Sequence, residues 1–216
     1  MKFNHIGVLT SRQSWFVLHA KKFVSYLKEN GFDAKLFFSH KKISSKYEVV
    51  FILSYFNKIE MKYLGRHKHN LVVHASGLPR GKGWAPLFWQ ILEGKNKIPI
   101  VLFEANETID GGIIYLKDNM IFNGDELYEE IRAKQAEKTK QLCGRFLEVY
   151  PSLRKYVQKG KSTFYRRRTP QDSNLDINKS LKSQINLLRI VDNHNFPAFF
   201  EYKGHKYILK IFKNHE

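Results

Sequence analysis

A short apolar strand that ends in a histidine and leads into a glycine-rich loop constrains this chain most. Residues 71–73 have the apolar, β-branched character of a buried strand, and His74 stands at its carboxyl end. The loop that follows leads to Pro86, which suits the first position of a helix, and it contains three glycines, Gly77, Gly81 and Gly83. Open α/β sheets bind ligands at the carboxyl ends of their strands. The segment therefore predicts an α/β fold with a ligand site beside His74.

Strands and helices alternate over the first half of the chain. Apolar runs predict strands over residues 4–9, 34–38, 49–53, 71–74 and 99–103. Apolar residues at helical spacing predict a helix over 16–27, ended by Gly31, and a short helix over 87–92. This order favours a Rossmann-like, mostly parallel twisted sheet flanked by helices. The first strand is not followed by Gly-x-Gly-x-x-Gly, which argues against a dinucleotide cofactor.

The second half begins with a predicted hairpin and a long helix. Strands over 112–116 and 120–122 are expected to join through Lys117, Asp118 and Asn119, and a helix follows over 124–149. A small C-terminal α+β unit contains a predicted helix over 180–190 and strands over 198–202 and 207–212, with a tight turn at Lys203-Gly204. The predicted division is a main domain over 1–150, a basic linker over 151–163 and a C-terminal subdomain over 164–216.

Basic residues outnumber acidic residues by a wide margin. The chain has 37 Lys and Arg against 20 Asp and Glu, a formal net charge of +17. This charge favours polyanionic partners such as nucleic acid, nucleotide diphosphates or acidic cofactors. The lysines are spread along the chain, so a lysine-rich solvated surface accounts for most of the excess.

The single cysteine and the lengths of the apolar runs indicate in which compartment to expect the protein. Cys143 has no partner for an internal disulfide, and its place in a helical apolar pattern predicts a core residue. No apolar run reaches the roughly 20 residues that span a bilayer. The first residues lead directly into a strand and leave no room for a signal peptide. We therefore expect a cytoplasmic protein without a membrane partner.

Three segments resemble formyltransferases that use N10-formyltetrahydrofolate. Residues 74–86, His-Ala-Ser-Gly-Leu-Pro-Arg-Gly-Lys-Gly-Trp-Ala-Pro, resemble the family signature, in which Asn-x-His-x-Ser-Leu-Leu-Pro precedes a basic loop and Ala-Pro. Residues 109–112, Ile-Asp-Gly-Gly, are similar to the second family motif. Residues 166–173, Arg-Arg-Arg-Thr-Pro-Gln-Asp-Ser, are similar to the C-terminal part of sugar-nucleotide formyltransferases. The resemblance extends in separate segments from residue 49 to residue 202, and these segments follow one another in the same order as in the family.

The resemblance implies formyl transfer to an amine with a small catalytic set. His74 would act as the general base, Asp110 would orient and charge its imidazole, and Ser76 is a candidate donor to the oxyanion. By itself, Asp-Gly-Gly is an ordinary turn, and an isolated histidine is usually structural. The roles of these residues therefore depend on the resemblance.

One position departs from the family pattern. Val72 stands where the family has an Asn two residues before the histidine. Asn70 cannot replace it, because at about 3.3 Å per strand residue it would lie about 13 Å from His74. The oxyanion would then be stabilised by protonated His74, a backbone N–H, Ser76 or Asn106.

The resemblance also implies sites for the donor and the acceptor, and no metal. The folate donor is assigned to the turn after the third strand and to the region of the second motif, at Ser54, Tyr55, Phe56, Glu104, Thr108 and Ile109. The acceptor is assigned to the glycine-rich loop, at Arg80, Lys82, Gly83 and Trp84. Arg80 could equally be solvated and Trp84 could equally be a core residue. The Arg166–Arg168 run could bind phosphate or pack the C-terminal unit against the main domain.

The favoured function is N-formylation of a nucleotide-linked amino deoxysugar, with N10-formyltetrahydrofolate as donor. The short chain resembles a compact subgroup linked to surface glycans and nonulosonic acids such as pseudaminic acid. The first alternative is a methionyl-tRNA formyltransferase-like enzyme, although roughly 50 residues after the linker is small for an RNA-binding domain. The second is a non-enzymatic basic nucleic-acid-binding protein, which the dispersed charge and the lack of a recognition motif disfavour. The oligomeric state, including a homodimer, is left open.

Overall fold

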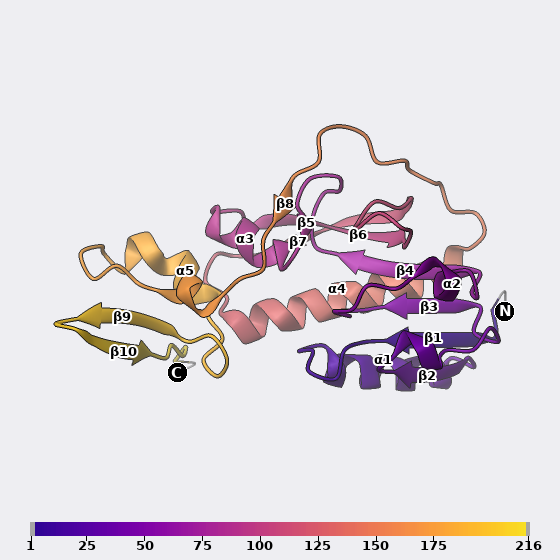
Figure 1. Ribbon diagram of the computed structural model, residues 1–216, viewed down its shortest axis with the longest axis horizontal. Coiled ribbons are helices and arrows are strands. Elements are labelled where there is room, and N and C mark those ends of the chain that lie inside the picture. Colours follow the sequence, from indigo (N-terminus) through magenta and orange to yellow (C-terminus); the bar gives the residue numbers. More distant parts are fainter. Residues whose placement is uncertain (1–2, 215–216) are drawn as a thin grey trace.

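A six-stranded sheet forms the centre of the computed structural model, which describes residues 3–214 (Figure 1). The strands lie in the order β2-β1-β3-β4-β6-β7. Their bounds are His5–Leu9 (β1), Asp33–Phe37 (β2), Val49–Ile52 (β3), His69–His74 (β4), Lys97–Glu104 (β6) and Ile114–Ile121 (β7). The first four strands of this order are parallel, and β6 is antiparallel to both β4 and β7. The predicted mostly parallel α/β sheet is therefore confirmed.

Helices cover the sheet with the apolar faces that their periodicity predicts. The helix α1 (Val17–Glu29) buries Ala20, Phe23, Val24 and Leu27, and α4 (Tyr128–Val149) buries Ile131, Leu142, Cys143 and Phe146 in the same core. The short helices α2 (Met61–Leu64) and α3 (Pro86–Leu92) lie between strands. Cys143 is fully buried, as predicted, and burial raises the pKa of its thiol. Within residues 3–214, no helix combines the length and apolarity needed to cross a membrane.

The predicted hairpin over 112–122 is wrong, because a single strand, β7, occupies this region. Lys117, Asp118 and Asn119 continue the ladder opposite β6. Three consecutive polar residues resemble a turn, but β7 is the last strand of the sheet and exposes part of its length to solvent. Asp118 is held by Lys138 of α4 at 3.0 Å. An edge strand tolerates such residues where a central strand would not.

The long helix also begins later than predicted, at Tyr128 instead of residue 124. The Glu126 carboxylate accepts the backbone N–H groups of Asn123 and Gly124, so the preceding residues form a turn. The Glu130 side chain then accepts the N–H of Leu127, as in a capping box. These side-chain contacts replace helical hydrogen bonds at the predicted start.

The C-terminal unit is irregular at its start and ends in a hairpin. The predicted helix over 180–190 is divided into a 3₁₀ turn, η3 (Lys182–Gln184), and α5 (Ile185–Arg189). The strands β9 (Ala198–Tyr202) and β10 (His205–Leu209) pair antiparallel, and the second is shorter than predicted. Lys203 and Gly204 have φ angles of 48° and 77°, which confirms the tight turn. A further 3₁₀ turn, η2 (Pro170–Ser173), precedes η3, and another, η1 (His40–Lys42), follows β2.

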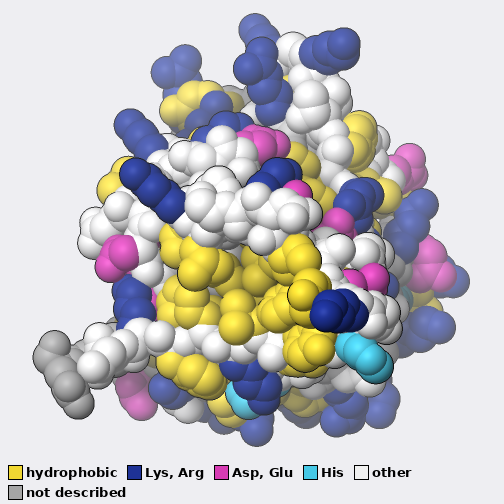
Figure 2. All heavy atoms as spheres, turned by 90° about the vertical axis from the view of Figure 1, so that its left-hand side faces the viewer, with side chains coloured by type: hydrophobic (Ala, Val, Ile, Leu, Met, Phe, Trp, Pro, Cys, Tyr) yellow, Lys and Arg dark blue, Asp and Glu magenta, His cyan; other side chains and the backbone are white. Residues whose placement is uncertain are grey.

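The segment between α4 and η2, residues 150–169, crosses the molecule and pairs with the glycine-rich loop (Figure 1). Its two-residue strand β8 (Phe164–Tyr165) lies parallel to β5 (Lys82–Gly83). The far end of the molecule, formed by the C-terminal unit, presents a broad apolar surface (Figure 2). Exposed large hydrophobic side chains of this unit include Ile177, Leu181, Ile185, Phe196, Tyr202, Tyr207, Ile208 and Phe212.

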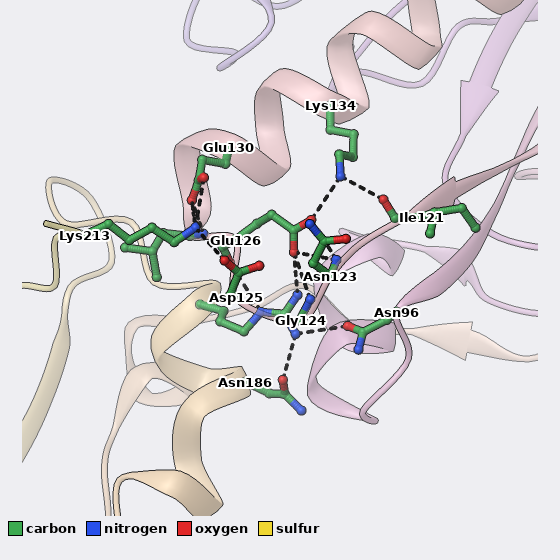
Figure 3. A network of polar contacts seen from close by, with 12 residues as sticks. Asn96, Ile121, Asn123, Gly124, Asp125, Glu126, Glu130, Lys134, Asn186 and Lys213 are labelled. Atoms are coloured by element: carbon green, nitrogen blue, oxygen red, sulfur yellow. Dashed lines mark hydrogen bonds and ion pairs between the residues drawn. The ribbon is translucent and has the colours of Figure 1, made fainter. Parts of the chain in front are cut away.

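A buried arginine joins the C-terminal unit to the main domain (Figure 3). Arg189 of α5 is 1% exposed, and its guanidinium donates to the carbonyl and the carboxylate of Glu126 at 3.3 and 3.4 Å. It also donates to the amide oxygens of Asn96, at 3.2 Å, and Asn186, at 2.9 Å. Each nitrogen of this guanidinium therefore has an acceptor.

Glu126 is the acceptor at the centre of the same network (Figure 3). Besides Arg189, its carboxylate accepts from the backbone of Asn123 and Gly124 and from Lys134 Nζ at 3.0 Å. Burial raises the pKa of Glu126, but the hydrogen bonds outweigh burial and lower the pKa to about 2. The network therefore fixes α5 against the start of α4.

Candidate functional site

A cavity of about 870 Å³ opens at the carboxyl ends of β3 and β4. One wall comprises the ends of these strands, the turn over 54–59 and the loop over 105–110. The rest of the lining comprises residues 13–16, parts of α3 and α4, residues 167–168 and part of the segment 190–196. The cavity lies where open α/β sheets place their ligands, as the sequence predicts.

His74 is the last residue of β4 and lies within this cavity, with its side chain 9% exposed. Its Nε2 is 2.8 Å from the carbonyl oxygen of Gly81. A carbonyl oxygen can only accept, so this contact places the proton of the neutral imidazole on Nε2. The lone pair is then on Nδ1, which lies 3.8 Å from Asp110 Oδ1. The basic nitrogen of His74 thus faces a carboxylate.

Asp110 reaches His74 from the loop after β6. Its Oδ2 accepts the backbone N–H of Gly83 at 2.8 Å, which orients the carboxylate. Gln158 donates to the carbonyl oxygens of Asp110 and Gly112, both at 2.9 Å, and so holds the loop from the crossing segment. The 3.8 Å separation is an ion-pair distance and exceeds a hydrogen bond. Gly81 therefore orients the imidazole, and Asp110 provides negative charge beside it.

Two glycines allow the loops around this pair to approach each other. A Cβ at Gly112 would lie 1.6 Å from the carbonyl oxygen of Glu104. A Cβ at Gly83, where φ is 91°, would lie 2.5 Å from the carbonyl oxygen of Tyr165. No side chain fits at either position. The Asp-Gly-Gly sequence and the glycine-rich loop are therefore required by the packing that brings Asp110 to His74.

Positive φ angles at residues other than glycine gather around the cavity. Ser54, Ala85 and Asp110 have φ angles of 53°, 46° and 49°, and all three line the cavity. Within residues 3–214, the remaining example is Lys203 in the C-terminal turn. Such conformations cost about 1–3 kcal/mol each and occur preferentially at functional sites. Their distribution supports this cavity as the functional site.

The residues predicted to bind the donor lie together, with one exception. Ser54, Tyr55, Phe56, Thr108 and Ile109 line the cavity. Glu104 does not, because its carboxylate accepts from His69 Nδ1 at 2.9 Å, the Asn70 N–H at 2.5 Å and Tyr115 OH at 3.2 Å. Side chains alternate along a strand, and it is the preceding Phe103 that lines the cavity.

Of the four residues predicted to bind the acceptor, two line the cavity and two lie outside its lining. Gly83 and Trp84 line the cavity, and Trp84 is 41% exposed. Arg80 is exposed outside the cavity lining, and Lys82 is buried outside it, with Nζ 5.8 Å from the ring centroid of Phe164. The structure therefore brings only two of these four residues to the cavity.

Besides His74, two side chains are candidates to stabilise the oxyanion, Ser76 and Asn106. Ser76 lies outside the cavity lining and is buried beside Gly81, and its Oγ has no hydrogen-bond partner. Asn106 lines the cavity, and its Oδ1 accepts the N–H of Thr108 at 3.0 Å, which leaves its amide nitrogen available. Val72 also lines the cavity, whereas Asn70 donates to the carbonyl of Leu64 at 2.8 Å. Asn106 is thus better placed than Ser76 to contact a ligand.

Sequence reasoning missed the wall that α4 and the C-terminal unit provide. Four residues of α4 line the cavity at spacings of four, three and four: Tyr128, Arg132, Gln135 and Thr139. This polar stripe at helical period was visible beside the apolar stripe of the same helix. Asp192 and Asn195 also line the cavity, but their position depends on where the C-terminal unit packs.

Metal ligation has no evident basis in the described part of the chain, residues 3–214. No group of three or more His, Cys, Asp or Glu side chains there is arranged to hold an ion. The chemistry available at the cavity is that of an imidazole beside a carboxylate, with backbone and amide donors nearby. This arrangement suits proton transfer coupled to attack on a carbonyl group.

The chain matches a curated protein over part of its sequence and several solved structures in fold. No family model matches the sequence. The methionyl-tRNA formyltransferase of Thermosipho melanesiensis is 32% identical over 120 residues, which are 56% of this chain and 39% of that protein. The chain thus matches well under half the length of this curated relative.

Solved structures match over nearly the whole chain. A methionyl-tRNA formyltransferase from Clostridium thermocellum has a TM-score of 0.79 at 20% identity, over 99% of this chain and 95% of that chain. A sugar N-formyltransferase from a Shewanella species has a TM-score of 0.69 at 15% identity, over 96% and 97%. HypX from Aquifex aeolicus in complex with tetrahydrofolic acid has a TM-score of 0.72 at 15% identity, over 95% and 37%. These likenesses establish the fold, an α/β sheet with small C-terminal sheets.

Proposed function

We infer that the chain is an enzyme of the formyltransferase family, and we propose that it transfers a formyl group from N10-formyltetrahydrofolate to an amine. The observation that carries this proposal is the pair formed by His74 and Asp110, with Nδ1 of the imidazole facing the carboxylate inside the cavity. The 32% identity to a methionyl-tRNA formyltransferase supports the reaction class. The likeness to HypX, whose structure contains tetrahydrofolic acid, supports the donor.

The cavity wall at the carboxyl ends of β3 and β4 suits the donor. Ile52, Leu64, Val72 and Phe103 provide apolar surface for a flat ring, and the turn Ser54–Phe56 adds backbone polar groups. The donor supplies an activated formyl carbon when it is bound there. We propose Ser54, Tyr55, Phe56, Thr108 and Ile109 as its contacts.

His74 and Asp110 would perform the proton transfers of the reaction. The amine nitrogen bonds to the formyl carbon, and His74 Nδ1 takes the proton that the nitrogen loses. Asp110 stabilises the resulting imidazolium, and in this proposal the Asn106 amide donates to the developing oxyanion. When the bond from the formyl carbon to the folate nitrogen breaks, His74 returns the proton to that nitrogen. The products are an N-formyl compound and tetrahydrofolate.

For the acceptor, we propose the amine of a nucleotide-linked amino deoxysugar, as used in surface glycan or nonulosonic acid biosynthesis. The likeness to a sugar N-formyltransferase over 96% of this chain and 97% of that chain supports this choice. Methionyl-tRNA is the second candidate, because the relative matched in sequence is a methionyl-tRNA formyltransferase. The proposed catalytic domain spans residues 1–150, with a linker over 151–163. The subdomain over 164–216 adds Asp192 and Asn195 to the cavity wall.

Incubation with N10-formyltetrahydrofolate and a panel of acceptors tests this proposal. The panel contains nucleotide-linked amino sugars with different nucleotides, the corresponding free amino sugars, and methionyl-tRNA. We expect tetrahydrofolate to form with at least one nucleotide-linked amino sugar and that acceptor to gain one formyl group by mass spectrometry. Formylation of methionyl-tRNA alone would select the second candidate. Absence of formyl transfer to every acceptor would contradict the proposal.

A further inference from the structure

Arginine side chains gather at one end of the cavity. Arg132 of α4 and the adjacent residues Arg167 and Arg168 line the cavity together with α3 and the turn that begins at Ser54. The wall at that turn contains one cationic side chain, Lys58, and the nearby loop contributes Glu107. The distribution of positive charge along the cavity is therefore uneven, and the excess lies beside α4 and the C-terminal unit.

Arg132 is enclosed by aromatic rings and lacks an ion-pair partner. Its guanidinium carbon lies 4.2 Å from the ring centroid of Phe88, 4.3 Å from Trp15 and 5.2 Å from Tyr128. Its guanidinium donates to the Gln135 amide oxygen at 2.9 Å and interacts with the Tyr128 hydroxyl, and within residues 3–214 its Nε is buried without a hydrogen-bond partner. Within residues 3–214, no carboxylate lies within 4 Å of it. A buried cationic donor in this state is costly unless a ligand pairs with it.

Arg168 presents a second guanidinium at the same wall. It lies 5.9 Å from the ring centroid of Phe88, whose ring also contacts Arg132. It donates to the carbonyls of Ile190 and Asp172 at 3.2 and 3.3 Å, and its Nε is also buried without a partner. No carboxylate of the described chain pairs with it within 4 Å. The two cations therefore repel each other across one ring.

The acidic groups nearby do not neutralise this pair. Asp192 acts on Arg132 through its charge, but its carboxylate accepts from the backbone of His194 and Asn195, at 2.9 and 3.0 Å, from the Asn195 amide, at 2.8 Å, and from the Tyr128 hydroxyl. Glu129 acts on Arg132 only at longer range. Burial lowers the pKa of the Arg132 guanidinium, which nevertheless stays charged because arginine is protonated throughout the physiological range. A ligand with negative oxygens would pair both guanidinium groups.

We propose that Arg132 and Arg168 bind a phosphate group of the acceptor substrate. Guanidinium groups match phosphate oxygens with paired N–H donors, and two cations suit a diphosphate. The site shares one cavity with His74, so one molecule can carry both the phosphate and the amine. The assignment rests on the proposed function and deepens it, because it names the side chains that bind the phosphate of the acceptor.

Titration calorimetry with inorganic pyrophosphate and with UDP as probes tests this site without catalysis. Arg132→Met and Arg168→Met are compared with Arg145→Met, which removes an exposed arginine of the same helix outside the cavity lining. We expect Arg132→Met to weaken both probes by about 10- to 100-fold, because hydrogen bonds to charged groups are strong. Arg168→Met should have a smaller effect in the same direction. Arg145→Met should stay within about twofold of wild type.

Tetrahydrofolate titration of the same variants separates the acceptor from the donor. We expect the dissociation constant for tetrahydrofolate to be the same in Arg132→Met as in wild type. Arg132→Lys should restore part of the pyrophosphate affinity that Arg132→Met loses. Loss of tetrahydrofolate affinity with unchanged pyrophosphate affinity would assign the arginines to the carboxylates of the donor and overturn the proposal. Wild-type protein that binds neither probe would also overturn it. Binding of pyrophosphate at Arg132 without formyl transfer to any acceptor would instead contradict the proposed function alone.

Discussion

Two arginine-centred regions of this protein differ in how completely their charges are paired. Arg189 is 1% exposed, and its guanidinium donates to a carboxylate, a carbonyl and two amide oxygens (Figure 3). Arg132 has one amide acceptor, three aromatic neighbours and a buried Nε without a partner. Arg189 belongs to the C-terminal unit and Arg132 lies near it. The chain supplies an acceptor for every guanidinium nitrogen of Arg189 but not for every one of Arg132.

The difference separates structural from functional roles. A fully paired buried ion stabilises one arrangement of the chain, because removing either partner leaves the other charge buried. An incompletely paired cation in a cavity contributes little to stability and is available to a ligand. We therefore expect substitutions in the Arg189 network to affect folding, and substitutions in the cavity to affect binding and turnover. The following experiments test this separation, in order of decreasing expected effect.

His74→Ala should give the largest effect, and the effect should be on turnover. General-base catalysis contributes about 100- to 10,000-fold, so we expect kcat to fall by that factor. The unfolding free energy and the tetrahydrofolate affinity should change little. Steady-state kinetics and urea denaturation provide the two readouts, with His205→Ala in the exposed C-terminal hairpin as the matched control. If His74→Ala keeps more than half of wild-type turnover, His74 is not the base.

Arg189→Met should destabilise the protein by about 3–5 kcal/mol, because it removes the buried cation that pairs with Glu126 and leaves only the partly exposed Lys134 beside that carboxylate. Urea denaturation measures this loss. The double variant Arg189→Met with Glu126→Gln should recover part of it, since the remaining buried group is then neutral. A single variant as stable as wild type would show that the network does not hold the C-terminal unit.

Acid should weaken the same network. The pKa of Glu126 is about 2 in the folded protein, against an ordinary value of 4.5. Because the folded pKa is lowered, Glu126 contributes stability above pH 4.5 that is lost as the pH falls toward 2. The contribution is about 3 kcal/mol, since one pKa unit corresponds to about 1.36 kcal/mol. The difference in unfolding free energy between wild type and Glu126→Gln should shrink over this range, and a constant difference would contradict the assignment.

Asp110→Asn should reduce turnover by about 10- to 100-fold, less than His74→Ala, because an adjacent carboxylate stabilises an imidazolium without transferring the proton itself. Asparagine tolerates the positive φ of this position and can still accept the N–H of Gly83. The fold should therefore survive, which circular dichroism can check. Full activity in Asp110→Asn would mean that the negative charge plays no part.

Arg132→Met should have the smallest effect on stability, within about 1 kcal/mol of wild type or slightly stabilising. Replacement of an unpaired buried cation by an apolar side chain removes a desolvation cost and keeps contact with the aromatic rings. Urea denaturation alongside Arg189→Met makes the comparison direct. A loss as large as that of Arg189→Met would show that Arg132 is structural.

Local patterns predicted most of the fold from the sequence. The strands that form the parallel sheet and the helices α1 and α4 follow from apolar periodicity, which depends on neighbouring residues. The predicted hairpin over 112–122 is wrong because three consecutive polar residues are typical of a turn. They also occur in a strand at the edge of a sheet, and the sequence does not show that β7 lies there. The start of α4 was misplaced because Glu126 caps a turn that periodicity does not reveal.

The candidate site was predictable in part. The approach of Asp110 to His74 followed from the family motifs, and strand alternation could have shown that Phe103, and not Glu104, lines the cavity. The stripe from Tyr128 to Thr139 was also visible in the sequence of α4. Asp192 and Asn195 could not be placed, because their position depends on contacts such as that of Arg189 with Glu126, residues 63 apart in the chain.

The fate of an isotopically labelled formyl group tests the central claim most directly. N10-formyltetrahydrofolate carrying ¹³C in the formyl group is incubated with wild-type protein and the acceptor found in the panel, and the products are followed by NMR. We expect the label to appear in a formamide on the acceptor nitrogen, with one tetrahydrofolate formed for each formamide, and the signal to be nearly absent with His74→Ala. Labelled formate in place of the formamide, or equal formamide from His74→Ala, would contradict the account.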